Sequence, residues 1–302
     1  MSVTVCDVGP RDGLQNEERT LAPEVRAELC RRLASAGVPR IEAVSFVNPA
    51  RVPQMAGAEE VLAGLERQPG VVHAGLVLNE RGYDRAVAAG VQEVHYAFPV
   101  TDEFCARNQN TTVAGAVALT ARLTSRARSD GLRITVTLGA SFGCPFEGRV
   151  EPSHVLDVAR RVVDAGPDEL VFADTIGVGV PAQVREIVEA AVSLGPAVGG
   201  HFHNTRNTGY VNALAAVESG ATVLDASLGG TGGCPFAPNA TGNISTEDLV
   251  YLLHGMGYAT RIDLDALLDH AAWLAEQLGK ELPGQLHKAG NFEPVAGSAI
   301  ER

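Results

Sequence analysis

Three things that this sequence lacks restrict its function before any motif is considered. None of its five cysteines forms a CxxC pair, so the sequence indicates neither a disulfide framework nor a cysteine-rich zinc site. No apolar run approaches the ~18 residues that a membrane-spanning helix needs. A first strand is expected within a few residues of Met1, which leaves no room for a signal or transit peptide. We therefore expect a cytoplasmic protein.

An excess of basic residues is also missing. The 24 Lys and Arg residues are outnumbered by 36 Asp and Glu residues, which gives a net charge of -12 and an isoelectric point of about 5.1. Such a chain is not expected to bind nucleic acid. The total does not exclude an anionic substrate, because a few cations inside a cleft can set the local field there.

What the sequence does contain is a regular alternation of helical and strand-forming stretches. Amphipathic stretches end at Gly37, Gly90, Gly166 and Gly220, and a short apolar run follows each glycine. Glycine is common at helix C-termini because it adopts the left-handed conformation at little cost. Short apolar runs after such glycines indicate parallel strands buried on both faces. Eight strands are expected, at residues 3–7, 41–46, 72–78, 94–98, 134–139, 169–173, 198–203 and 222–227.

Eight strands that alternate with helices predict an α/β fold of the (β/α)₈ TIM barrel type. The alternative, a doubly wound open sheet, would need a glycine-rich phosphate turn after the first strand, where this chain has an Arg-Asp pair. We expect a catalytic barrel over residues 1–258 and a loose tail over 291–302. Between them, residues 259–290 are expected to form a helical appendage on the barrel. Its helix contains Trp273 and is expected to stop at Pro283.

A group of candidate metal ligands falls at the predicted strand ends. His201 and His203 close the seventh strand and, two residues apart, point to the same face. Asp12 follows the first strand, which only the eighth strand separates from the seventh in a closed ring. Two imidazoles, a carboxylate and the amide oxygen of Asn243 suit Mg²⁺ or Mn²⁺ better than a structural zinc ion. Taken alone, the HxH pair is equally typical of exposed or core histidines.

Arg11 stands beside Asp12 on a Gly/Pro-rich turn that we expect to be irregular. A cation in that place can stabilise an enolate, although an isolated Arg-Asp pair is also typical of a surface salt bridge. Glu42 and Asp174 lie at or within apolar strands, where a buried carboxylate needs a partner. Arg11 is the expected partner of Glu42, whereas Asp174 can instead cap a turn. The histidines outside the HxH pair are interpreted as ordinary residues.

The glycine-rich segment 229–236 follows the eighth strand and carries Cys234. A thiol on such a loop can carry a proton to or from carbon if its pKa is suitable. The alternative is a flexible connector with an incidental cysteine. The segment is not a P-loop, because it lacks GxxxxGK[ST]. Cys144 is interpreted as structural.

Together these residues resemble the hydroxymethylglutaryl-CoA lyase family, which comprises metal-dependent TIM barrels related to the isopropylmalate and homocitrate synthases. The resemblance extends from residue 3 to about residue 257. Its motifs are GPRDGLQNE at 9–17, SFVNP at 45–49, VPQM at 52–55, GCPFEG at 143–148, DTIGVG at 174–179, GGCPFA at 232–237 and GN at 242–243.

The resemblance implies a retro-Claisen cleavage of 3-hydroxy-3-methylglutaryl-CoA to acetyl-CoA and acetoacetate. It also implies a divalent metal, Mg²⁺ or Mn²⁺, and an acyl-CoA as the substrate. The general base is left open between His201, Asp12 and a water on the metal. The implied metal ligands are Asp12, His201, His203 and Asn243; the implied catalytic residues are Arg11, Glu42, Asp174, Cys234 and His201; and those near the substrate are Arg11, Gln15 and Ser45.

One departure from the family bears on the substrate. Lyases of this family usually continue the second metal histidine with Asp-Thr-Tyr-Gly, whereas this chain has Asn204, Thr205 and Arg206. We hypothesise that Arg206 contacts an acidic group of a different substrate. The alternatives are therefore the same chemistry on another branched 3-hydroxyacyl-CoA, a Claisen-type condensing enzyme, or a non-enzymatic barrel. The full set of metal and arginine positions argues against the last. A homodimer is expected.

Overall fold

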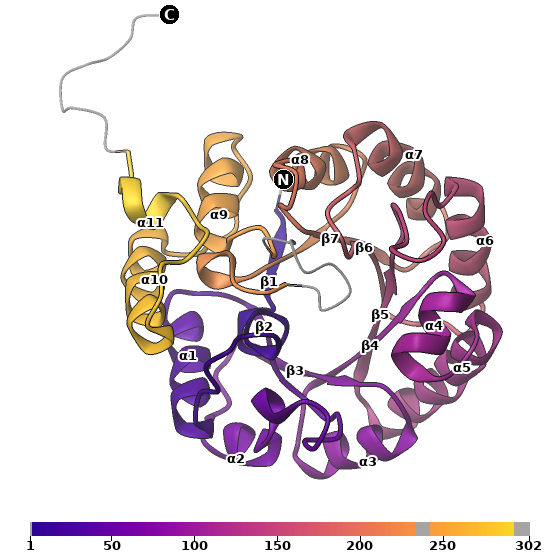
Figure 1. The fold of residues 1–302 in the computed structure, drawn as a ribbon, viewed down its shortest axis with the longest axis horizontal. Coiled ribbons are helices and arrows are strands. Elements are labelled where there is room, and N and C mark those ends of the chain that lie inside the picture. The colour runs from indigo at the N-terminus through magenta and orange to yellow at the C-terminus, as the bar shows by residue number, and fades with distance from the viewer. Residues whose placement is uncertain (1, 234–241, 293–302) are drawn as a thin grey trace, which may run out of the picture.

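The computed structural model describes residues 2–233 and 242–292 of the chain (Figure 1). Its eight parallel strands pair in chain order, and β1 pairs with β8 to close the ring. The closed ring confirms the predicted TIM barrel and excludes the open sheet. The strands are β1 (Thr4–Asp7), β2 (Arg40–Ser45), β3 (Val72–Val77), β4 (Glu93–Pro99), β5 (Arg133–Gly139), β6 (Glu169–Asp174), β7 (Ala197–Phe202) and β8 (Val223–Ala226).

The helices form the outer layer around the strands (Figure 1). Their inward faces bury Leu29, Leu33, Leu123 and Ile187, among others, against the sheet. No helix within residues 2–233 and 242–292 has the length and apolar character that a membrane crossing requires. The helices are α1 (Pro23–Ser35), α2 (Ala58–Ala63), α3 (Glu80–Ala88), α4 (Asp102–Gln109), α5 (Val113–Asp130), α6 (Pro152–Val163), α7 (Pro181–Val192), α8 (Gly209–Glu218), α9 (Thr246–Gly255), α10 (Leu264–Leu278) and α11 (Leu286–Ala289).

After the barrel, the chain continues into α10, which packs against α1 and α9. The side chain of Asp263 accepts a hydrogen bond from the backbone N–H of Ala266 (3.1 Å) and so caps the start of α10. The helix ends at Leu278 and is capped by Gly279, whose φ of +67° suits glycine. The prediction that this helix continues to Pro283 was therefore wrong. The domain boundaries at 258 and 290 remain predictions.

The interior of the barrel contains charged side chains. Arg40 on β2 donates to both carboxylate oxygens of Glu169 on β6 at 2.8 Å. Because β2 and β6 lie on opposite sides of the ring, this contact crosses the interior. Arg40 also lies 3.4 Å from Glu93 on β4. Alternate residues of a strand share a face, so Glu42 and His95 continue on the same inward faces as Arg40 and Glu93.

Candidate active site

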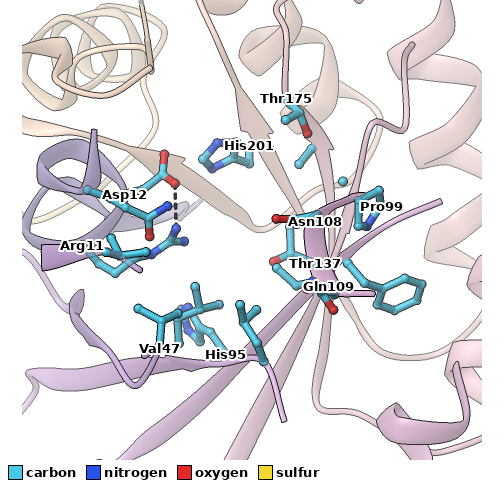
Figure 2. Close-up of a pocket in the computed structure, with 18 of the residues that line it drawn as sticks. Arg11, Asp12, Val47, His95, Pro99, Asn108, Gln109, Thr137, Thr175 and His201 are labelled. Atoms are coloured by element: carbon cyan, nitrogen blue, oxygen red, sulfur yellow. Dashed lines mark hydrogen bonds and ion pairs between the residues drawn. The ribbon is translucent and has the colours of Figure 1, made fainter. Parts of the chain in front are cut away.

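A cavity of about 540 Å³ lies at the C-terminal ends of the strands, where TIM barrel enzymes have their active sites (Figure 2). Arg11, Asp12 and His201 line one part of it. Asn108 and Thr137 line the part that faces them in Figure 2. The cavity therefore collects residues from opposite sides of the ring, as the sequence pattern of strand-end residues predicts.

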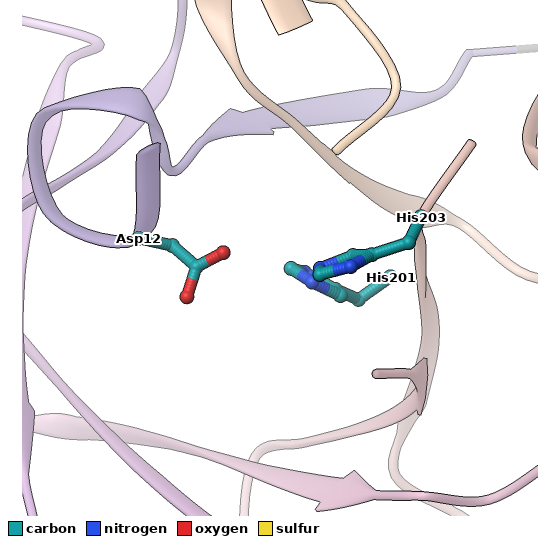
Figure 3. Close-up of side chains that lie close together, drawn as sticks. All are labelled: Asp12, His201 and His203. Atoms are coloured by element: carbon teal, nitrogen blue, oxygen red, sulfur yellow. The ribbon is translucent and has the colours of Figure 1, made fainter. Parts of the chain in front are cut away.

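Asp12, His201 and His203 meet at one point of this cavity (Figure 3). One ligand atom from each lies within 4.8 Å of the other two. The two imidazoles come from the end of β7, with ring centroids 5.3 Å apart, and the carboxylate reaches them from the segment after β1. The buried Nδ1 of His203 has no hydrogen-bond partner within the described residues. Such an arrangement leaves donor atoms available for a cation.

The segment that carries Arg11 and Asp12 is more regular than the sequence suggested. Gly9–Gly13 forms a single π-helical turn, in which the N–H of Gly13 donates to the carbonyl of Val8 (3.1 Å). The expectation of an irregular turn was therefore wrong. A Cβ atom at Gly9 would lie 2.7 Å from the carboxylate of Asp7, so a residue without a side chain is needed there. Turns of this type are rare and occur frequently at functional sites.

The charges around Asp12 keep it ionised. Arg11 Nη1 lies 2.7 Å from Asp12 Oδ1. Burial alone would raise the pKa of Asp12, but the charges of Arg11, His201 and His203 outweigh it and lower that pKa to about 2. Burial and the neighbouring His201 lower the pKa of His203 to about 4. At neutral pH, this pair therefore offers a carboxylate and a neutral imidazole, the forms that bind metals.

His201 has a carboxylate partner that the sequence reasoning missed. Its Nδ1 lies 3.1 Å from Oδ2 of Asp225 on β8. Burial would lower the pKa of His201, but the hydrogen bond with Asp225 and the charges of Asp225 and Asp12 outweigh it and raise that pKa. A carboxylate behind a metal-binding histidine fixes the orientation of the ring. The available signal was an aspartate inside the apolar run 222–227.

Asn243, the fourth predicted ligand, lies beside Asp12. Its Nδ2 donates to Asp12 Oδ2 (2.9 Å) and to the carbonyl of Thr231 (3.1 Å). Gly232 approaches this amide closely: a Cβ there would lie 2.6 Å from Asn243 Nδ2, and its φ is +120°. The glycine-rich segment thus packs directly against the ligand group.

The donor set fits a divalent cation. It contains one ionised carboxylate, a neutral imidazole with an unpartnered nitrogen, and a second imidazole held by Asp225. Oxygen and imidazole ligands suit Mg²⁺, Mn²⁺ or a similar ion. No cysteine takes part in the group that Asp12, His201 and His203 form.

Glu42 and Asp174 are both buried, but Glu42 bonds to a side chain and Asp174 to backbone N–H groups. The Nε of Arg11 donates to Glu42 Oε2, so the predicted Arg11–Glu42 pair is present. Burial raises the pKa of Asp174, which accepts hydrogen bonds from the backbone N–H groups of Val178 and Gly179 (both 2.9 Å). Asp174 therefore caps the turn after β6, which was the alternative interpretation from the sequence.

The other predicted site residues are scattered. Gln15 lines the cavity, whereas Ser45 is fully buried in β2 and does not line it. Arg206 does not line it either, because its Nη1 donates to the carbonyls of Ile176 (3.0 Å) and Gly177 (2.9 Å). Cys234 lies outside the described residues.

His95 was interpreted as an ordinary histidine, but it lines the cavity. Its Nδ1 lies 3.0 Å from Glu42 Oε1 and its Nε2 lies 3.4 Å from Glu93 Oε1. The signal that could have identified it is its spacing: it follows Glu93 by two residues on the same inward face of β4. The partner on β2, Glu42, is brought to this face only when the strands close into a ring.

The fold and the site define a class: a TIM barrel enzyme with a carboxylate–imidazole metal site at the C-terminal ends of its strands. The family model described as HMGL-like matches residues 2–273. The chain therefore belongs to the HMGL-like family. It is 46% identical to (R)-citramalyl-CoA lyase of Chloroflexus aurantiacus, over 97% of this chain and 96% of that protein. It is 40% identical to hydroxymethylglutaryl-CoA lyase of Pseudomonas mevalonii, over 92% and 93% of the two chains.

A solved structure agrees with these relatives. The hydroxymethylglutaryl-CoA lyase of Acinetobacter baumannii, in complex with coenzyme A and 3-methylmalate, superposes with a TM-score of 0.92 at 38% identity. The superposition covers 97% of this chain and 98% of that one. The family resemblance that the sequence motifs indicate is confirmed, and the protein is a carbon–carbon lyase of the hydroxymethylglutaryl-CoA lyase type. HMGL-like lyases use a divalent metal, and Asp12, His201 and His203 are the group that fits one.

Proposed function

We propose that this protein cleaves a tertiary 3-hydroxyacyl-CoA that carries a carboxylate, releasing acetyl-CoA and an oxo acid. The observation that carries this proposal is the convergence of Arg11, Asp12 and the two β7 histidines on one cavity. A fixed cation beside a metal-binding group can stabilise both the alkoxide side and the enolate side of such a cleavage.

The bond changes in this reaction balance without a co-reactant. The 3-hydroxyl proton goes to a base, and the O–H electron pair forms the carbonyl of the oxo acid. The bond between C2 and C3 breaks, and its electron pair passes into the thioester enolate. Protonation at C2 then gives acetyl-CoA. No oxidant or reductant is consumed.

Arg11 is the residue that we assign to the developing negative charge on oxygen. Its Nε is held by Glu42 and its Nη1 by Asp12, while Nη2 donates to none of the described residues. The third nitrogen is therefore available to a substrate oxygen. Charge stabilisation by a preorganised donor needs no reorganisation during the reaction.

Asp12, His201 and His203 would hold the divalent cation, with Asn243 as a fourth ligand. When bound, the ion supplies Lewis acidity toward the oxygens of the substrate. Asp225 keeps the His201 ring in place through the 3.1 Å contact with its Nδ1. Glu42 keeps Arg11 beside Asp12, so that cation and ligand group stay together.

For the acyl group, we propose (R)-citramalyl-CoA as the first candidate and hydroxymethylglutaryl-CoA as the second. The identity of 46% to a citramalyl-CoA lyase exceeds the 40% to the Pseudomonas mevalonii hydroxymethylglutaryl-CoA lyase. Both substrates carry hydroxyl, methyl and carboxyl-bearing groups on C3, and they differ by one methylene. Cleavage gives pyruvate from the first and acetoacetate from the second.

A binding observation on a relative supports the same class of substrate. The Acinetobacter baumannii structure contains coenzyme A together with 3-methylmalate, a small hydroxy dicarboxylic acid. A cavity of about 540 Å³ is in the usual range for a site that receives a small molecule. We therefore expect the acyl part to enter the cavity of this protein.

The test is a coupled assay for release of acetyl-CoA from each thioester, with Mg²⁺, with Mn²⁺ and with EDTA. We expect metal-dependent turnover of (R)-citramalyl-CoA above about 1 per second. The kcat/KM for this substrate should exceed that for hydroxymethylglutaryl-CoA by at least about tenfold, since one methylene is worth roughly that factor. If hydroxymethylglutaryl-CoA is the better substrate instead, the proposed reaction stands and the proposed acyl group is wrong.

Two further outcomes would reject the proposal. Release of free coenzyme A from acetyl-CoA and an oxo acid would identify a condensing enzyme, because synthases of that kind hydrolyse the thioester. Absence of turnover with every branched 3-hydroxyacyl-CoA, in metal-loaded folded protein, would reject the lyase reaction itself.

A further inference from the structure

A row of charged side chains of alternating sign leads from the interior of the barrel to the candidate metal ligands. Each member lies near the next: 3.4 Å separates Arg40 from Glu93 and Glu93 from His95, and 3.0 Å separates His95 from Glu42. Glu42 accepts from Arg11, whose Nη1 lies 2.7 Å from Asp12. In order, the row is Arg40, Glu93, His95, Glu42, Arg11 and Asp12.

His95 occupies the middle of this row. Its side chain is 8% exposed, and its two ring nitrogens face two different buried carboxylates. Burial alone would lower the pKa of His95, but the hydrogen bond with Glu42 and the charges of Glu42 and Glu93 outweigh it and raise that pKa to about 10. The ring is therefore an imidazolium at neutral pH: its Nδ1 donates to Glu42 Oε1, whereas its Nε2 makes no hydrogen bond within the described residues and faces Glu93 Oε1 at 3.4 Å.

We propose that His95 is a positioning residue of the active site: it holds one oxygen of Glu42, so that the other oxygen fixes the guanidinium of Arg11 beside Asp12. The inference rests on the proposed function, because Arg11 matters only if it acts on a reacting oxygen. His95 itself need not touch the substrate.

The need for a cation at this position follows from burial. Glu42 and Glu93 are 1% and 0% exposed, and they belong to strands that are separated only by β3. Without a cation between them, two buried carboxylates would repel each other and lose solvation. Arg11, which already bonds to Glu42, would then be its remaining cationic partner among the described residues, and the guanidinium would be drawn away from Asp12.

A double-mutant cycle tests whether His95 acts through Glu42. We would measure kcat and KM for His95→Gln, Glu42→Gln and the double variant. His95→Gln should lower kcat by about 10–100-fold, the usual range for loss of a supporting residue, with KM changed less than about threefold. The double variant should be no slower than Glu42→Gln alone, because effects within one network are not additive. His95→Leu, which removes the donor as well as the charge, should be slower than His95→Gln.

His73 offers a matched control. It lies on the adjacent β3, has the same whole-residue exposure as His95, and does not line the cavity. His73→Gln should therefore lower the melting temperature, because it changes a buried side chain. It should leave kcat within about twofold, because His73 does not line the cavity. A loss of kcat equal to that of His95→Gln would show a general packing effect and would overturn the proposal.

Two other results would overturn it. One is an unchanged kcat in folded His95→Gln; the other is a double variant whose loss of kcat is the product of the two single losses.

If the wild type cleaves none of the thioesters, the proposed function fails, and nuclear magnetic resonance tests the geometry independently of activity. The ¹⁵N spectrum should show His95 doubly protonated at pH 8, and Glu42→Gln should lower its pKa. A neutral wild-type ring at pH 8 would contradict the proposal even if both His95 variants failed to fold.

Discussion

Two sides of the same cavity differ in how their side chains are held (Figure 2). On the charged side, comprising Arg11, Asp12 and His201, each side chain has at least one charged partner. The neutral side comprises Asn108, Gln109 and Thr137. Of these three side chains, only that of Gln109 is hydrogen-bonded within the described residues: its Nε2 donates to the carbonyl of Ala97 (2.6 Å). Within the described residues, the side chains of Asn108 and Thr137 make no hydrogen bond to the protein.

This difference indicates that the charged side serves the chemical step and that the neutral side determines substrate preference. Side chains that hold one another in fixed positions suit the chemical step, which requires preorganised charge. Polar side chains without a protein partner are free to bond to a substrate, and a site whose polar groups expect a partner discriminates strongly against ligands that lack one. We therefore expect substitutions on the charged side to lower kcat, and substitutions on the neutral side to change substrate preference.

The largest effect is expected for Arg11→Met. Removing the cation that faces the developing charge should lower kcat by about 10²–10³-fold, the usual loss for one such donor. Bound Mn²⁺, measured by elemental analysis, should remain near the wild-type level, because Asp12, His201 and His203 are unchanged. Arg128→Met on α5, which removes a guanidinium 3.4 Å from the carbonyl of Gly166, is the control and should leave kcat unaltered. A loss below tenfold would contradict the role of Arg11.

A smaller loss is expected when the charged side keeps its ligands but loses a support. Asp225→Asn removes the charge behind His201 and changes which ring nitrogen carries the proton. Supports of this kind are worth about 10–100-fold in metal affinity or activity. Isothermal titration with Mn²⁺ and steady-state kinetics would measure both. Wild-type affinity and kcat in folded Asp225→Asn would show that the 3.1 Å contact does not orient the ring.

The sequence predicted the part of the charged side that lies at strand ends. Asp12, His201 and His203 follow the first and seventh strands, and parallel strands in a closed ring bring such ends together. His95 and Asp225 were missed because they lie within apolar strands, where their partners come from other strands. An interpretation that treats each strand alone cannot pair residues that lie on different strands.

Arg206 shows the opposite case. The sequence made it a candidate for substrate contact because a cation stands near the metal histidines. In the structure its guanidinium bonds to the backbone carbonyls of Ile176 and Gly177, in the turn after β6. The direction of a long side chain on a loop depends on which carbonyls are left free nearby, and composition does not contain that information.

On the neutral side, Thr137→Val is expected to change preference rather than rate. The substitution keeps the shape of the side chain and removes one hydroxyl from β5. The ratio of kcat/KM between (R)-citramalyl-CoA and hydroxymethylglutaryl-CoA should change by up to about tenfold, because one hydrogen bond is worth roughly 0.5–1.5 kcal/mol. The kcat for the better substrate should fall less than about threefold. Equal losses for both substrates would show that the neutral side also supports the chemical step.

The smallest expected effect concerns stability and tests whether the charged side extends down to His95. The fold raises the pKa of His95 from 6.5 to about 10, so between these values the folded protein holds a proton that the unfolded chain has lost. This stabilisation is complete below pH 6.5 and is lost as the pH rises through 10. Glu42 and Glu93, which face the ring, and Arg40 beyond Glu93 keep their charges throughout this range.

In calorimetric scans, the melting temperature of His95→Gln should therefore fall furthest below that of the wild type near pH 6.5, and the difference should shrink toward pH 10. His73→Gln is the matched comparison, because burial lowers the pKa of His73, which is neutral in both states above pH 6.5. Its deficit should stay constant over the same range. A constant deficit for His95→Gln as well would mean that the ring is not charged in the fold. The charged side would then end at Glu42.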